Sequence, residues 1–212
     1  NPYGDGYYDD FNTAVGLDSA GRTQLHHKGK LVIGVENTPT VIFDLMQFLV
    51  IDLGGVVGQI GMGQHGTAFA HAGMRMGPAI CYEGLYGDFY GDFVRRGAQF
   101  MAIISNDGWW GDTPGYKHLF TISRLRAIEH RRAIARSANT GMSGFISARG
   151  DIGETLGWEK RGVISAAVPL NSELTFYTRY GDYLGRIAEY LTLLCVLYYI
   201  AYRVKKKNYL VK

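Results

Sequence analysis

The sequence predicts an α/β domain built in layers, and three observations support this fold class. Short apolar runs typical of buried strands alternate with amphipathic segments typical of helices. With 212 residues, 47% hydrophobic and 19% charged, the chain is long enough for a sizeable core and too apolar for a disordered protein. Polar side chains gather just past the predicted strand ends, where such folds place their sites.

The first part of the chain predicts a β-hairpin followed by a long loop. Residues 7–17 and 22–27 alternate like strands and are joined by the turn signal Asp18-Ser19-Ala20-Gly21. Residues 29–66 are rich in glycine, and their apolar patch at 41–53 suggests one short helix. These glycines form no phosphate-binding motif, so we interpret them as turns and close backbone approaches.

The layered part begins after this loop. We expect strands at 76–80, 100–104, 134–139, 143–147 and 163–168, with a hairpin turn at 148–151. We expect helices at 90–97, which ends in a glycine, and at 117–132. Five arginines alternate with apolar residues around the second helix, so we interpret them as its solvated face: Arg124, Arg126, Arg131, Arg132 and Arg136.

The net charge of +3 is concentrated at the C-terminal end. The last ten residues hold five bases and no acid, whereas residues 1–202 hold 17 bases and 19 acids. This segregation argues against a globally basic nucleic-acid binder, so we expect no nucleic-acid partner.

An uncharged apolar run, residues 191–202, precedes this basic tail. Its twelve residues are too few for a bilayer and fit a buried core helix equally well. Extension back to Tyr183 gives 20 residues but includes Arg186 and Glu189, which would have to lie near the headgroups. Tyrosines beside the lysines favour the membrane. We expect a transmembrane helix at 183–204, a basic cytoplasmic tail at 205–212 and a catalytic domain at 1–182.

Cysteine chemistry must come from a single thiol, because the chain has only Cys81 and Cys195. Cys81 directly follows an apolar strand, where a thiol can be exposed while its backbone is held rigidly, although a lone cysteine is also a common small core residue. The six histidines show no metal-ligand spacing, so we expect no metal and no other cofactor. Lys28 ends a predicted strand, a position most often occupied by a solvated charge.

Several motifs resemble those of apolipoprotein N-acyltransferases, membrane members of the nitrilase superfamily. The stretch from Lys28 to Glu36, KGKLVIGVE, resembles the family's K-x-[HK]-L-V-P-x-x-E. Ala79 to Glu83, AICYE, resembles its nucleophile motif, and Ser105 to Asp112, SNDGWWGD, resembles its N-D-x-W-[FW]-G-D loop. Similar matches follow at 124–129, 138–141 and 174–182, in the family's order along nearly the whole chain.

This resemblance implies a nitrilase-like α-β-β-α sandwich, incomplete at its N-terminus, with a Cys-Lys-Glu site. Cys81 would take an acyl group from a phospholipid as a thioester and pass it to the N-terminal amine of diacylglyceryl-cysteine in an apolipoprotein. Lys28 would stabilise the oxyanion. The family also requires Glu83, Tyr82 and Glu36, while Asn106, Trp109 and Trp110 would line the acyl pocket. The two tryptophans fit a core or a membrane interface equally well.

The sequence departs from the family at two positions. Nothing before the Lys28 strand resembles the family's general-base glutamate: the acids there are Asp5, Asp9, Asp10 and Asp18. We therefore expect either a C-terminal fragment that is inactive alone or a degenerate homologue. Ile33 replaces the usual proline.

Two other functions stay open from the sequence. A soluble amidase or carbamoylase would use the same three residue types, and a membrane-anchored homologue could have lost the chemistry. The resemblance favours an enzyme of the bacterial inner membrane, with its catalytic domain on the periplasmic side.

Overall fold

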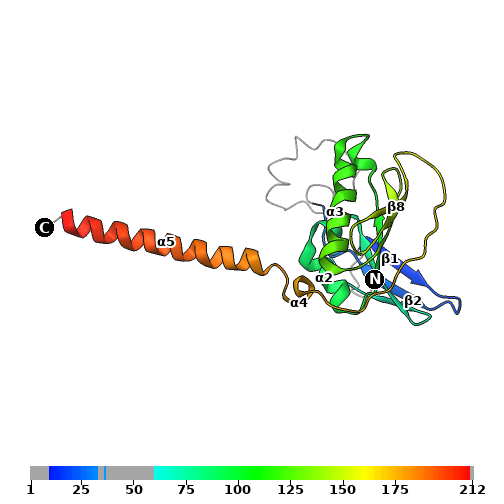
Figure 1. The fold of residues 1–212 in the computed structure, drawn as a ribbon, viewed down its shortest axis with the longest axis horizontal. Helices are drawn as coiled ribbons and strands as arrows, with labels where there is room; N and C mark the ends of the chain where they lie inside the picture. The colour runs from blue at the N-terminus through cyan, green and yellow to red at the C-terminus, as the bar shows by residue number, and fades with distance from the viewer. Residues whose placement is uncertain (1–9, 33–35, 37–59, 211–212) are drawn as a thin grey trace, which may run out of the picture.

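The computed structural model describes residues 10–32, Glu36 and residues 60–210 (Figure 1). Strands β1 (Thr13–Leu17) and β2 (Thr23–His27) form an antiparallel two-stranded sheet, which is the predicted hairpin. Six more strands form the main sheet in the order β3-β4-β5-β6-β7-β8. These strands are β3 (Phe69–His71), β4 (Met74–Ile80), β5 (Phe100–Ser105), β6 (Ile134–Ala138), β7 (Ser143–Ile146) and β8 (Ile152–Leu156). The central strands β4, β5 and β6 are parallel, and the outer pairs are antiparallel.

Two helices cover one face of the main sheet. They are α2 (Gly87–Arg95) and α3 (Pro114–His130). Helix α3 begins where Thr113 accepts a hydrogen bond from the Gly115 N–H and Pro114 presets the first turn. The core lies between these helices and the sheet, and its members are Ala79, Tyr90, Phe93, Val94, Ala98, Met101, Ile103, Phe120, Ala127, Ile134 and Ile146.

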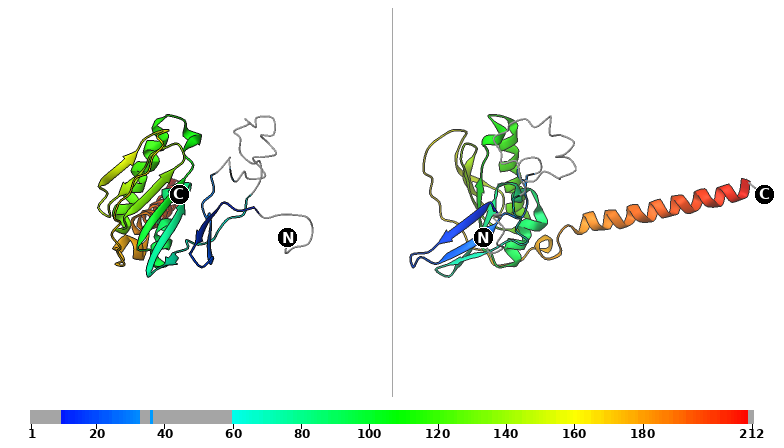
Figure 2. Two further views of the ribbon diagram at one scale, coloured as in Figure 1. Left: turned by 90° about the vertical axis from the view of Figure 1, so that its right-hand side faces the viewer. Right: turned by 180° about the vertical axis from the view of Figure 1, so that it is seen from behind.

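The hairpin lies beside the β3–β4 end of the main sheet (Figure 2). Ala14 of β1 packs there against Phe69 and Ile80, which form a second, smaller core. The described residues thus give a helix layer, a mixed sheet and part of a second sheet. The predicted α/β class is confirmed, although no helix covers the outer side of the hairpin among these residues.

The strand predicted at 163–168 is wrong. This segment belongs to no sheet, and Val163 is 95% exposed. Its alternating pattern resembles a strand, but a strand also needs a neighbouring backbone, and the described residues provide none for it. The short helix predicted within 41–53 lies outside the described residues.

Three of the five arginines predicted to be solvated are buried, so that interpretation is also wrong for Arg126, Arg132 and Arg136. Arg132, which is 1% exposed, donates to the carbonyls of Ala98 at 2.7 Å and Glu173 at 2.9 Å. A buried guanidinium is tolerated when its donors are satisfied, which residue type alone does not show.

The C-terminal helix leaves the body of the protein as an isolated rod (Figure 1). A short helix, α4 (Phe176–Tyr180), precedes it, and α5 runs from Tyr183 to Leu210. The segment Tyr183–Arg203 is long and apolar enough to cross a membrane, and none of its apolar window is buried by the rest of the chain. It is therefore no core helix of this domain.

Candidate functional site

Cys81 occupies the turn where β4 ends. Its backbone has φ +46, in the left-handed region that a side chain other than glycine rarely adopts. A short 3₁₀ helix, η1 (Cys81–Leu85), starts at the same residue. This sharp turn leaves the thiol half-buried on the wall of a cavity of about 600 Å³. Backbone strain of this kind is frequent at functional sites.

Seven of the eight predicted site residues line this cavity. They are Lys28, Glu36, Cys81, Tyr82, Asn106, Trp109 and Trp110. Ile104, Leu119 and the two tryptophans form an apolar wall, and Trp109 and Trp110 are 51% and 46% exposed. The eighth residue, Glu83, does not line the cavity.

Lys28 is held in place by Glu36. The Lys28 side chain is 2% exposed, and its Nζ donates to the two Glu36 carboxylate oxygens at 2.8 and 2.7 Å. Glu36 also accepts from the Val32 N–H and from the Asn12 amide. Burial raises the pKa of Glu36, but the hydrogen bonds from Lys28, Val32 and Asn12 outweigh it and hold this pKa below its ordinary value. The Glu36 carboxylate is therefore ionised at neutral pH and holds the Lys28 side chain in one position.

Glu83 ties the lysine strand to the cysteine strand. It is fully buried and accepts from the backbone N–H groups of Gly29 and Ile80, each at 2.6 Å. His26 Nε2 lies 3.1 Å from both of its carboxylate oxygens. Gly29 and Ile80 are the direct neighbours of Lys28 and Cys81, so one carboxylate fixes how the two cavity residues lie relative to each other.

A buried ion pair holds the loop that carries Asn106. Asp107 is fully buried, and Arg136 of β6 donates to both of its carboxylate oxygens at 3.0 Å. The Ser105 hydroxyl donates to Asp107 at 2.6 Å. A Cβ at Gly141 would lie 2.0 Å from Asp107 Oδ2, so the neighbouring turn needs glycine. Asn106, which lines the cavity, therefore lies on a rigid loop.

Sequence reasoning missed three residues that build this site: Asn12, His26 and Arg136. Asn12 was assigned to the first strand, but β1 starts one residue later. The sequence shows His26 only as one of six histidines without metal-ligand spacing, and it predicts Arg136 as a solvated charge. The sequence offered one signal for Asn12, namely that this polar residue stands directly before β1. No group of three or more His, Cys, Asp or Glu in the described part of the chain could hold a metal ion.

Comparison with known proteins gives the class of this protein. The sequence model of the carbon-nitrogen hydrolase family matches residues 2–174, and the chain belongs to that family. Saccharomyces cerevisiae Nit3, a member of branch 10 of the nitrilase superfamily, superposes with a TM-score of 0.52 and 18% identity over 71% of this chain and 51% of its own. This likeness shows the nitrilase fold that the sequence motifs predicted.

Within this class, the similar curated proteins are named apolipoprotein N-acyltransferase. The Chlorobaculum tepidum protein is 36% identical over 181 residues, which cover 82% of this chain and 34% of the relative. The Rhizobium meliloti protein is 42% identical over 97 residues, which cover 46% of this chain and 18% of the relative. The predicted resemblance is confirmed. The chain spans about a third of the length of the first relative and less of the second.

Proposed function

We propose that this chain carries the nucleophile and oxyanion site of an N-acyltransferase that modifies apolipoproteins. The observation that supports this function best is the shared cavity: Cys81 and the buried Lys28 line it together with an apolar wall of Ile104, Trp109 and Trp110. A thiol and a fixed ammonium that line one cavity suit covalent acyl transfer, and the apolar wall suits a fatty chain. The names of the relatives agree with this chemistry.

The proposed reaction has two halves. The Cys81 sulfur attacks the ester carbonyl carbon of a phospholipid, the carbon–oxygen ester bond breaks, and the lysophospholipid leaves with the thiol proton. The α-amine of a diacylglyceryl-cysteine then attacks the thioester carbon and forms an amide as the carbon–sulfur bond breaks, and the proton that the amine loses returns to the sulfur of Cys81. In both halves negative charge develops on the carbonyl oxygen, where Lys28 Nζ would act.

The remaining predicted residues receive supporting roles. Glu36 is a positioning residue, because its carboxylate is already occupied by Lys28, Val32 and Asn12. Glu83 is also a positioning residue through Gly29 and Ile80, since it does not line the cavity. Tyr82 and Asn106 would contact the polar part of the substrate. The proposed chemistry needs no cofactor.

We further propose that α5 anchors the protein in the membrane. Tyr183 and Tyr202 bracket 19 helical rises, or about 29 Å, which matches the ~30 Å hydrocarbon core of a bilayer. Arg203, Lys205 and Lys206 follow at once, as the positive-inside rule expects of the cytoplasmic side. In this proposal the catalytic domain (1–182) lies on the periplasmic side of a bacterial inner membrane, residues 183–204 span the membrane, and the tail (205–212) lies in the cytoplasm.

Transfer to a lipid-modified peptide tests the function. The protein is reconstituted in vesicles of a phospholipid with a labelled acyl chain and mixed with a peptide whose N-terminal cysteine carries diacylglycerol. Transfer gives amide-linked label on the peptide, which Cys81→Ala should abolish and Cys195→Ala should retain. Label on Cys81 without transfer to the peptide would instead fit the incomplete site expected from the sequence. Hydrolysis of a small amide without any transfer would instead make the protein an amidase of the same family.

A further inference from the structure

The short helix α4 and the first turn of α5 expose aromatic rings beside the anchor. Phe176 is 61% exposed and Tyr180 55% exposed. The centroid of the Phe176 ring lies 4.5 Å from that of Tyr180, in a tilted arrangement, and 5.0 Å from that of Tyr183, edge to face, so the three rings form one contact group. A group of exposed aromatic rings in mutual contact indicates a contact surface.

Two arginines flank these rings. Arg179 is exposed, and its guanidinium makes no hydrogen bond or ion pair with the residues that the structure describes. Arg186 is exposed one turn into α5 and donates to the Tyr180 carbonyl, so it folds back towards the body of the protein. Both cations thus lie at the level of the aromatic group. We call Phe176, Arg179, Tyr180, Tyr183 and Arg186 the foot.

The foot is fixed to the catalytic domain by buried polar contacts. Thr178 is fully buried between the exposed members of α4; its carbonyl accepts from Arg95 of α2 at 3.0 Å, and its hydroxyl lies 2.9 Å from His130 Nδ1 of α3. The Thr175 hydroxyl donates to the Glu129 carbonyl at 2.6 Å, and the Asp182 N–H donates to Asp88 at 3.1 Å. The helix is therefore a rigid part of the domain rather than a loose linker.

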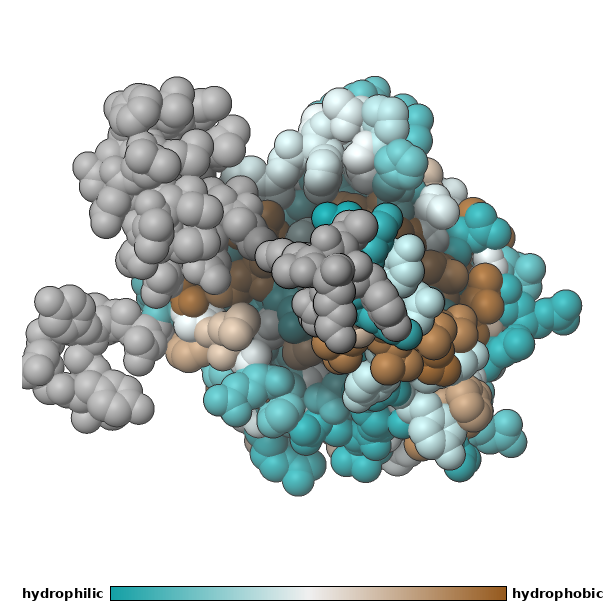
Figure 3. All heavy atoms as spheres, turned by 90° about the vertical axis from the view of Figure 1, so that its left-hand side faces the viewer, coloured by the Kyte–Doolittle hydropathy of each residue, from teal (hydrophilic) through white to brown (hydrophobic). Residues whose placement is uncertain are grey.

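We propose that the foot docks into the headgroup layer of a phospholipid bilayer and sets the height of the catalytic cavity above the membrane. The proposal rests on the membrane anchor proposed above. Aromatic rings with adjacent arginines suit the headgroup region, where the rings lie among glycerol and acyl groups and guanidinium groups pair with phosphate. The surface is continuous with α5, which points towards the viewer in Figure 3, so the hydrophobic residues in the middle of that view include those of α5 itself.

The position of α2 links the foot to the chemistry. Helix α2 begins two residues after η1, and Cys81 is the first residue of η1. A foot that binds the headgroups and is locked on α2 would hold the nucleophile at one distance from the lipids. A phospholipid ester also lies in the headgroup region, so a fixed height favours entry of that bond into the cavity.

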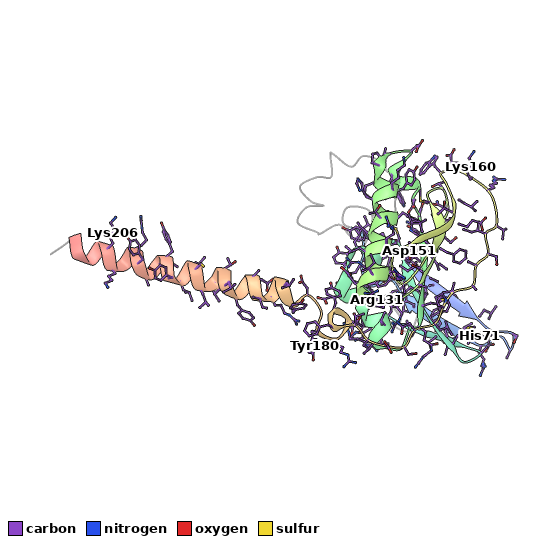
Figure 4. The ribbon with its side chains drawn as sticks, in the orientation of Figure 1. His71, Arg131, Asp151, Lys160, Tyr180 and Lys206 are labelled. Atoms are coloured by element: carbon purple, nitrogen blue, oxygen red, sulfur yellow. The ribbon has the colours of Figure 1, made fainter. Side chains whose placement is uncertain are left out.

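Spin-label accessibility measures the docking. The full chain, with Cys81→Ser and Cys195→Ser, is reconstituted in phosphatidylcholine vesicles and labelled at one of three added cysteines: Leu193→Cys in α5, Tyr180→Cys in the foot, or Lys160→Cys. Lys160 and Tyr180 lie at opposite ends of the domain (Figure 4). We expect a water-soluble nickel chelate to reach Lys160→Cys freely, Tyr180→Cys only weakly and Leu193→Cys not at all. Phe176→Cys replaces Tyr180→Cys if that variant does not fold.

Each outcome decides one claim. A shielded label at Leu193→Cys with a foot label as accessible as Lys160→Cys would overturn the docking but keep the anchor. A water-accessible label at Leu193→Cys would overturn both. Phe176→Ser combined with Arg179→Gln should make the Tyr180→Cys label accessible, whereas the matched pair Leu170→Ser with Arg161→Gln should not. Shielding that survives loss of the foot residues would point to a protein neighbour and contradict a lipid contact.

Discussion

At the residue scale, the site depends on buried charges that hold one another. Lys28 is almost fully buried, and Glu36 contacts its Nζ with both carboxylate oxygens while being held in turn by Val32 and Asn12. An ammonium fixed in this way is already oriented before substrate arrives. Preorganisation of this kind is what makes electrostatic stabilisation of an oxyanion effective.

Replacement of Lys28 tests this role. Lys28→Met should slow acylation of Cys81 by about 10²–10³-fold, the usual effect of removing one oxyanion donor. The matched control is Lys30→Met, since the Lys30 ammonium lies over the rings of Tyr86 and Phe89, at 5.2 and 5.4 Å, and does not line the cavity. Single-turnover acylation measures both, with circular dichroism to verify folding. Equal rates for the two variants would remove Lys28 from the mechanism.

Sequence reasoning could find the residues that line the cavity but not those that hold them. Cys81 and Lys28 stand at strand ends within recognisable motifs, so their shared location was predictable. The buried position of Glu83 could not be predicted, because a carboxylate two residues after the nucleophile could equally face the cavity or the core. Arg136 was predicted to be solvated, since nothing local reveals that Asp107 lies opposite it on the neighbouring strand end.

At the element scale, the parallel strands β5 and β6 place the Asp107 loop beside the β6 strand that carries Arg136. Their register pairs Ile103 with Arg136, so the arginine lies within reach of the loop that follows β5. The ion pair of Arg136 and Asp107 is buried, with side chains that are 2% and 0% exposed. Such a pair stabilises the fold only while both partners are present.

Removal of one charge tests this pair. Asp107→Asn should destabilise the protein by about 3–5 kcal/mol, because it leaves the Arg136 charge buried and unpaired. The control Asp151→Asn, at an exposed turn, should stay within about 0.5 kcal/mol. Urea unfolding in detergent micelles measures both. A change at Asp107 no larger than the change at Asp151 would mean that the loop is held by other contacts.

Helix α3 carries a second buried group, His130, under α4. Burial, followed by the charge of Arg126, lowers the pKa of His130 to about 3 from an ordinary value of 6.5. Between these values the unfolded chain binds a proton that the folded protein does not. Stability should therefore fall as pH falls below 6.5, with a slope of up to about 1.4 kcal/mol per pH unit.

This pH dependence can be assigned with two variants of one helix. His130→Gln should flatten the decline in unfolding free energy between pH 6.5 and pH 5, whereas His118→Gln, at an exposed position of α3, should leave the slope unchanged. Urea unfolding at several pH values gives the slopes. A slope that His130→Gln does not alter would show that other groups cause the decline.

Helices and strands were predicted correctly where the apolar pattern extended over a whole element and its end signals lay within the same segment. The strands β4 and β5 and helix α3 have clear apolar periods and end signals, and each lies within a few residues of its predicted place. Strand β3 has three residues, too few for a period, and residues 163–168 have the period without a partner strand. Strand formation depends on a distant backbone that one segment's sequence does not contain.

At the scale of the whole molecule, the structure joins a nitrilase-type domain to a helix that the domain does not bury. The apolar side chains between Tyr183 and Tyr202 are exposed, which agrees with the proposal that α5 lies in an apolar environment. The apolar run at 191–202 fits a core helix and a membrane helix equally well. The apolar window of α5 is not buried by the described part of the chain, and this favours a membrane helix. Because α4 is fixed to the domain and leads into α5, we expect the orientation of the cavity relative to the membrane to depend on both parts of the molecule.

The central claim is that Cys81 is an acyl-accepting nucleophile, and an activated acyl donor tests it most directly. A fatty-acid p-nitrophenyl ester has a leaving group that needs little help from a general acid, so its reaction rate depends mainly on the nucleophile and on the oxyanion donor. Mass spectrometry should find one acyl group on Cys81, released by hydroxylamine, absent in Cys81→Ala and slowed in Lys28→Met. No acyl group on Cys81, or acylation of Cys195 alone, would contradict the account.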